Sequence, residues 1–162
     1  MEIFEEVPKL YRISIALLAG LTLFAADPQP SDLVDSRLVQ IREFFRKHAC
    51  PVEHLAEEFL AAADRHGLDW RLLPSLALVE SGGGRASRAN NIFGWGRVRF
   101  PSVADGIFTV ARSLADGRNY RGKSLEQKLW TYNPMAGYIT KVKNVMQQLG
   151  PHPSDQNSTA RK

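Results

Sequence analysis

A strongly apolar segment that ends at a single carboxylate is the feature that most constrains the fold of this chain. Residues 72–79 (LLPSLALV) lead directly into Glu80, and Ser81 and three consecutive glycines follow. The apolar segment predicts a buried helix, and the glycines predict that this helix ends at once in a loop. Burial is expected to favour the protonated form of a carboxylic acid, and the glycine loop leaves room for a ligand beside it. The sequence therefore predicts one proton donor at the end of a buried helix.

Length and charge limit the remaining possibilities. The chain of 162 residues is long enough for one domain with a sizeable core. Its net charge of +4 would favour an anionic polymer, but the basic residues are not interleaved with aromatic ones, so we expect no nucleic-acid partner. Cys50 is the only cysteine and the four histidines lack the spacing of metal ligands. We therefore expect neither a metal nor another cofactor.

The pattern of apolar and basic residues at the N-terminus predicts an export signal. Residues 13–26 are uncharged and apolar, a length that suits a secretory signal and is shorter than the roughly 20 residues of a spanning helix. Lys9 and Arg12 precede this run, which favours export of everything downstream. We therefore expect the protein to be periplasmic, in the cell envelope or secreted.

Two features of the same segment leave alternatives open. The first residues are net acidic, and bulky side chains stand where cleavage prefers small ones. Residues 1–26 are therefore predicted to be either a signal peptide or an uncleaved N-terminal membrane anchor. A buried N-terminal helix of a cytosolic domain is the remaining alternative.

Apolar residues at helical spacing predict a mainly α domain over residues 27–149. Residues 82–99 are rich in Gly and Asn and predict an irregular lobe after the third helix. The polar residues 150–162 predict a disordered tail. The expected helices run from a cap at Ser31 or Asp32 to about Cys50, from Val52 to about His66, from a cap at Asp69 through Glu80, from a cap at Ser102 to about Leu114, from Leu125 to Trp130 and from Tyr138 to Leu149.

Two clusters of aromatic and amide residues are candidates for binding. In the segment 90–96 (NNIFGWG), Phe93 is typical of a core residue, whereas Trp95 lies between two glycines and suits stacking on a sugar. Asn90 and Asn91 either fix the loop by local hydrogen bonds or bind an acetamido group, and the sequence leaves both roles open.

The second cluster is the corner at residues 130–138 (WTYNPMAGY). Its Asn-Pro pair ends one helix before the next begins, so Tyr132 and Tyr138 flank the corner. Tyr138 matches the buried face of its helix. Tyr132 stands at a helix end, from which it would reach a cleft. A phenol hydroxyl near Glu80 would hold a substrate amide or tune the acid.

In this order the clusters resemble the lysozyme-like peptidoglycan-cleaving enzymes. They are most similar to the endo-β-N-acetylglucosaminidase domain family (mannosyl-glycoprotein endo-β-N-acetylglucosaminidase-like), with kinship to soluble lytic transglycosylases. The similarity runs from about Val52 to Leu149. Its motifs are GLDWRLL at 67–73, VESGGG at 79–84, NNIFG at 90–94, FPSVADGI at 100–107 and Tyr132-Asn133-Pro134 with Tyr138.

The resemblance implies a lysozyme-like helical domain with a short irregular lobe after the catalytic helix. It implies that Glu80 is the general acid and that the substrate is the β-1,4-linked N-acetylated amino sugars of peptidoglycan. The Asn-Asn-x-Phe-Gly loop and a tyrosine would line the glycan cleft of a protein that we expect to be a monomer. The candidate catalytic residues are Glu80 and Tyr132, and the candidate substrate-binding residues are Ser81, Asn90, Asn91, Phe93, Gly94, Trp95 and Tyr138.

One departure from the family pattern bears on mechanism. Residues 81–104 contain no Asp or Glu, whereas an inverting hydrolase needs a base and a retaining one needs a nucleophile. Two routes use one acid: attack by the substrate's 2-acetamido group followed by hydrolysis, or ring closure by the sugar's 6-hydroxyl to an anhydro product. Asp105 is a candidate for a distant base, but its place in the first turn of a helix favours a role in supporting the helix cap.

Two non-catalytic hypotheses stand beside the enzyme. The chain is either a cell-wall-binding module that has lost turnover, or an anchored interaction protein that uses the fold as a scaffold.

Overall fold

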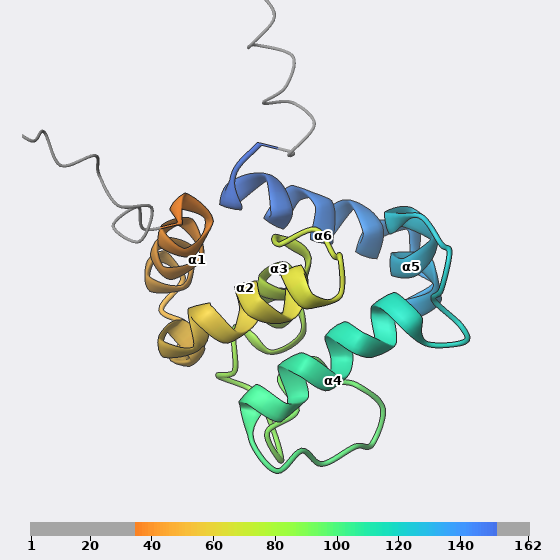
Figure 1. Ribbon diagram of the computed structural model, residues 1–162, viewed down its shortest axis with the longest axis horizontal. Helices are drawn as coiled ribbons and strands as arrows, with labels where there is room; N and C mark the ends of the chain where they lie inside the picture. Colours follow the sequence, from red (N-terminus) through yellow and green to blue (C-terminus); the bar gives the residue numbers. More distant parts are fainter. Residues whose placement is uncertain (1–34, 152–162) are drawn as a thin grey trace, which may run out of the picture. The chain divides into compact units, whose positions relative to one another are not determined.

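The apolar segment that ends at Glu80 forms the central helix, α3 (Leu72–Ser81). Its side chains are buried on every side from Leu72 to Ala77, so the helix must be surrounded by others. It packs against α2 (Ala56–Arg65) and α6 (Ala136–Leu149), and Figure 1 shows it in the middle of the helices. Gly82 closes the helix in the left-handed conformation, with φ 62°, as the glycine run predicted.

The structure is a computed structural model that describes residues 35–151. The predicted signal or anchor, the proposed caps Ser31 and Asp32, and tail residues 152–162 lie outside this range. The prediction of a mainly α fold is confirmed, and the only β pairing in the described range is one bridge between Arg88 and Asn91. No helix within this range is long and apolar enough to cross a membrane. The other helices are α1 (Ser36–Lys47), the 3₁₀ helix η2 (Pro51–Leu55), α4 (Val103–Asp116) and α5 (Leu125–Tyr132).

The first two predicted helices differ from the observed ones at their ends. Helix α1 begins at Ser36, because the Asp35 carboxylate accepts a hydrogen bond from the backbone N–H of Arg37 at 2.8 Å and caps it there. The predicted helix over residues 52–66 is two elements. Pro51 opens a tighter 3₁₀ turn, and the α-helical part begins only at Ala56.

The later helices agree more closely with the sequence pattern. Ser102 caps α4 by accepting from the backbone N–H of Asp105 at 3.0 Å, and Asp105 accepts in return from the Ser102 hydroxyl at 2.7 Å. The predicted cap at Asp69 is wrong, because the residue at the cap position of α3 is Arg71 and no side chain caps the helix there. Asp69 lies three residues before Leu72, and its carboxylate accepts from the Arg71 N–H at 3.0 Å in the turn that precedes the helix. The apolar face predicted for the last helix is buried as a whole: Tyr138, Val142, Val145, Met146 and Leu149.

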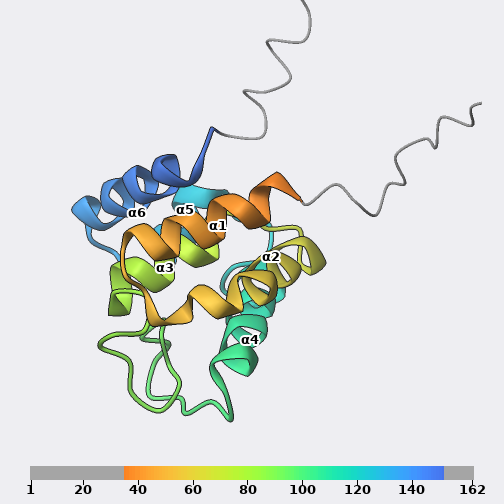
Figure 2. The same cartoon turned by 90° about the vertical axis from the view of Figure 1, so that its left-hand side faces the viewer.

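The segment between α3 and α4 is the irregular lobe. Figures 1 and 2 show it as loops below α3 that run to the start of α4. Its buried members Ile92, Phe93 and Phe100 join the helical core, which fixes the lobe against the helices. The end of α3, and therefore Glu80, faces this lobe.

Candidate active site

Glu80 lies in the last turn of α3 and is half-buried between α6 and the loop. The Tyr138 hydroxyl donates a hydrogen bond to Oε1 at 2.6 Å. The other oxygen, Oε2, lies beside Gly94, where an added Cβ would stand 3.2 Å from it. The two oxygens therefore have different surroundings, with a phenol at one and a glycine backbone at the other.

Two tyrosines from the corner between α5 and α6 stack beside the acid. The rings of Tyr132 and Tyr138 are nearly parallel, with centroids 5.9 Å apart and an interplanar angle of 10°. The Tyr132 hydroxyl donates to the backbone carbonyl of Phe93. The phenol that contacts Glu80 is thus Tyr138, whereas the sequence analysis named Tyr132 as the catalytic tyrosine. Because Tyr138 sits in the first turn of α6 and α6 packs on α3, it reaches the carboxylate from its buried position.

The aromatic residues form a continuous row that ends at Glu80. The Trp95 ring lies 5.5 Å from that of Tyr132 and 5.7 Å from that of Tyr120. Trp95 is half-buried, so part of the indole packs in the row and part remains accessible. Tyr120 was not predicted, because it lies in a turn after α4 with no local pattern to mark it. The row Tyr120–Trp95–Tyr132–Tyr138 thus places four aromatic rings beside one carboxyl group.

The environment keeps these phenols in their protonated form. Burial raises the pKa of Tyr138, and its hydrogen bond to Glu80 and the charge of that group raise it further. Burial raises the pKa of Tyr132, with a further contribution from the charge of Glu80, and burial also raises the pKa of Tyr120. Tyr138 therefore remains a hydrogen-bond donor to Glu80.

The raised pKa values predict how stability changes at alkaline pH. Below the unfolded phenol pKa of about 10 the contribution of Tyr132 and Tyr138 is fully present. Above it the unfolded phenols ionise and the folded ones do not, so the unfolded state binds fewer protons and the free energy of unfolding falls. In a pH titration of phenolate absorbance, two of the four tyrosines should ionise only as the protein unfolds. Tyr132→Phe and Tyr138→Phe should each remove one of these late phenols, and four ionisations near pH 10 with the fold intact would contradict the prediction.

The two predicted asparagines use their side chains within the loop. Asn90 Nδ2 donates to the carbonyls of Phe100 at 2.9 Å and Pro101 at 3.1 Å. Asn91 Oδ1 accepts from the Trp95 N–H at 2.9 Å, and its Nδ2 donates to the carbonyl of Val98 at 3.1 Å. Of the two roles left open by the sequence, the structure shows the loop-fixing hydrogen bonds. Asn91 thereby orients Trp95.

Two other candidates for substrate contact lie behind the surface of the site. Ser81 is 5% exposed, donates to the Ile92 carbonyl at 2.7 Å and accepts from the Gly84 N–H at 2.9 Å. Phe93 is fully buried in the core, 6.2 Å from the ring of Phe59. Their side chains hold the end of α3 and the loop together, so the expectation of direct side-chain contact with substrate does not fit this packing.

Glu80 lines none of five surface pockets on the described part of the chain, whereas the candidate residue Asn90 lines one of them, with Gly84 and Ile92. Within residues 35–151 there is also no group of three or more His, Cys, Asp or Glu side chains that would hold a metal ion. What the arrangement offers chemically is one oriented carboxyl group at the end of an aromatic row.

Comparisons with protein-family models, with curated proteins and with solved structures found no match to this chain.

Proposed function

We propose that this protein is a cell-envelope glycosidase with a lysozyme-like fold that cleaves β-1,4-glycosidic bonds of peptidoglycan, as endo-β-N-acetylglucosaminidases do. The observation that carries the proposal is the carboxyl group of Glu80, whose Oε1 is held by Tyr138 at 2.6 Å while Oε2 lies beside a glycine. The predicted signal or anchor at residues 1–26 supports export to the compartment of this substrate.

Glu80 acts as the general acid. A glycosidic oxygen leaves poorly without a proton, and a carboxylic acid within hydrogen-bond distance supplies it. Since the Tyr138 hydroxyl occupies Oε1, Oε2 is the oxygen from which the proton is transferred. A side chain at position 94 would crowd this oxygen, because an added Cβ on Gly94 would stand 3.2 Å from it.

The rest of the reaction uses the substrate's own groups. In the first route the 2-acetamido oxygen bonds to the anomeric carbon as the glycosidic bond breaks and the leaving oxygen takes the proton of Glu80. Water then attacks that carbon, the bond from the acetamido oxygen to the carbon breaks, and the Glu80 carboxylate accepts the proton of the water. In the second route the sugar's 6-hydroxyl attacks instead, gives its proton to the carboxylate and leaves an anhydro ring, as lytic transglycosylases do. Trp95, which is half-buried, supplies the surface on which a sugar ring stacks.

Product analysis tests this proposal. The full chain incubated with purified peptidoglycan is expected to release soluble muropeptides, and mass spectrometry would separate the two routes because their products differ by one water. The sugar at the new chain end identifies the bond that is cut. Release of no products beyond those of heat-inactivated protein would contradict the proposed activity.

A non-catalytic cell-wall-binding module is the second candidate. It is favoured by the absence of a carboxylate between Glu80 and Asp105, because no second acidic residue of this segment is available as a base or nucleophile. Such a module would sediment with insoluble cell wall and release no products. Trp95→Ala would weaken this binding, whereas Glu80→Gln would leave it unchanged.

A further inference from the structure

The charged residues of the lobe beside Glu80 are all positive. The stretch 81–104 contains four arginines and no acidic residue. Arg88, Arg97 and Arg99 are exposed, and their side chains form no ion pair or hydrogen bond with another residue of the range 35–151. Arg85 differs, because it donates to the carbonyls of His48 and Ala49. Three guanidinium groups of the lobe are therefore available to an external anion.

The part of the lobe that carries two of these arginines is fixed in shape. Phe100 is buried, and its backbone N–H donates to the Ala89 carbonyl at 3.1 Å, which closes the loop at its base. Inside the loop, a turn runs from Trp95 to Val98, and Asn91 donates to the carbonyls of both turn ends at 3.3 and 3.1 Å. Gly96 supplies the positive φ of 56° that this turn requires. A loop held in this way loses little entropy when a ligand binds.

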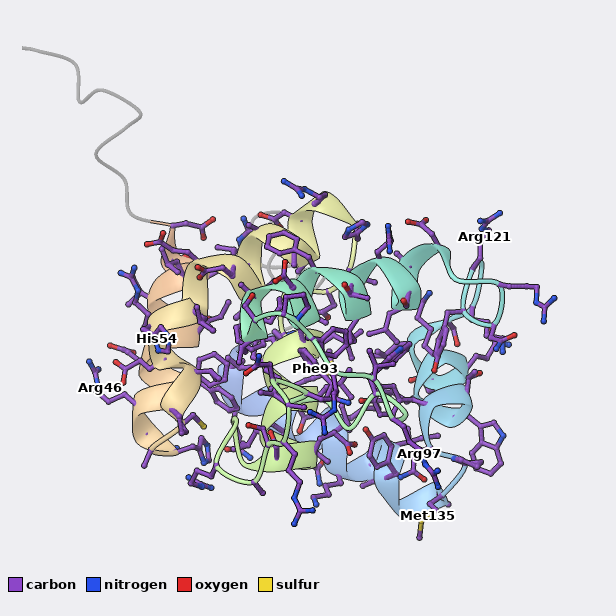
Figure 3. All side chains as sticks on the ribbon, turned by 90° about the horizontal axis from the view of Figure 1, so that it is seen from below. Arg46, His54, Phe93, Arg97, Arg121 and Met135 are labelled. Atoms are coloured by element: carbon purple, nitrogen blue, oxygen red, sulfur yellow. The ribbon has the colours of Figure 1, made fainter. Side chains whose placement is uncertain are left out.

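The same loop forms one side of the candidate active site. Gly94 lies against Glu80 Oε2, and Trp95 packs on Tyr132. Arg97 follows in the turn that Asn91 fixes, and Figure 3 shows it at the same end of the view as Met135, the residue that precedes α6. Arg97 is two residues from Trp95 in this turn and Arg99 follows it, so a polymer that reaches Glu80 along the aromatic row would pass close to this part of the loop.

We propose that Arg97 and Arg99 bind carboxylates carried by the glycan, so that the site selects an acidic glycan over a neutral one. The inference rests on the proposed function, since it assigns the loop to the same substrate. Guanidinium groups bind carboxylates through paired, charge-assisted hydrogen bonds. The neighbouring positive charges also repel one another, so a bound anion relieves that repulsion.

The test measures binding apart from cleavage. The full chain carrying Glu80→Gln is sedimented with peptidoglycan and with the same material after its carboxylates are converted to neutral amides. Arg97→Gln/Arg99→Gln in this background should raise the Kd for the acidic material about tenfold. Amidation of the peptidoglycan should raise the Kd of the Glu80→Gln protein by a similar factor. Amidation should cause no further rise in Kd for the protein that also carries Arg97→Gln/Arg99→Gln. Arg112→Gln/Arg118→Gln is the matched control, because it removes the same charge from two exposed arginines of α4 and the turn after it, and it should change the Kd less than twofold.

The binding and product measurements distinguish failure of the acidic-glycan site from failure of the proposed glycosidase activity. Equal binding by the Arg97→Gln/Arg99→Gln protein and the control, no effect of amidation, or no binding to either material would overturn it. If the unsubstituted chain releases products while the Kd values do not move, the inference fails and the glycosidase stands. If no products appear but binding follows the expected pattern, the acidic-glycan site stands and the catalytic proposal fails. Thermal unfolding of each variant, expected to match the parent, confirms that the exposed substitutions leave the fold intact.

Discussion

Glu80→Gln is expected to reduce the initial rate of muropeptide release by at least about a hundredfold, the usual contribution of a general acid. The amide keeps the shape of the side chain, and its oxygen still accepts the hydrogen bond that Tyr138 donates to Glu80 Oε1 at 2.6 Å. It cannot transfer a proton to the leaving oxygen or accept one from water. The loss should therefore appear in kcat, with little change in the amount of protein bound to peptidoglycan.

A surface substitution of the same chemistry provides the control. Glu43 lies on the exposed side of α1, with a side chain that is 62% exposed. Glu43→Gln removes one carboxylate at a distance from the aromatic row, and the rate of release should stay within twofold of that of the parent. Equal rates for Glu80→Gln and the unsubstituted protein would end the catalytic proposal.

Gly83→Ala is expected to lower the free energy of unfolding by about 3 kcal/mol or more, because strain and overpacking add at this position. Gly83 has a φ of 65°, in the left-handed region that a residue with a side chain adopts at a cost. An added Cβ would also stand only 2.5 Å from the Cβ of buried Cys50 and would overlap its Sγ. The glycine loop and the residue before η2 would have to move apart.

Gly67 separates the two contributions. It has a similar φ of 58°, but an added Cβ there meets nothing within 4 Å. Gly67→Ala should therefore cost only the backbone strain, about 1 kcal/mol. In denaturant unfolding, Gly83→Ala should remain destabilised in a Cys50→Ala background, where the Cβ is retained, and recover in part in a Cys50→Gly background. Equal losses at the two glycines would show that the contact with Cys50 does not matter.

The predictable part of the fold is local in origin. The face of α6 and the cap of α4 at Ser102 were correct because periodic apolar residues and a capping hydroxyl act within a few residues of one another. The start of α1 was misplaced because several Asp and Ser residues near it are each able to cap, and Asp35 is the one that does. The 3₁₀ turn before α2 was missed because its apolar pattern is compatible with both kinds of helix.

Some features of the candidate site could also be predicted from the sequence, and others depend on tertiary packing. From the sequence alone follow the buried helix α3, the acid at its end and the glycine that closes it, because composition and the order of residues decide these. Only the tertiary structure decides that Tyr138 rather than Tyr132 meets Glu80, since the docking of α6 on α3 sets which hydroxyl reaches the carboxylate. It also decides that Asn90 and Asn91 bond to the loop backbone and that Ser81 and Phe93 face the core. The partners lie from 7 to 58 residues away along the chain, beyond the few residues over which helical spacing and capping patterns act, so tertiary packing decides which partner each side chain meets.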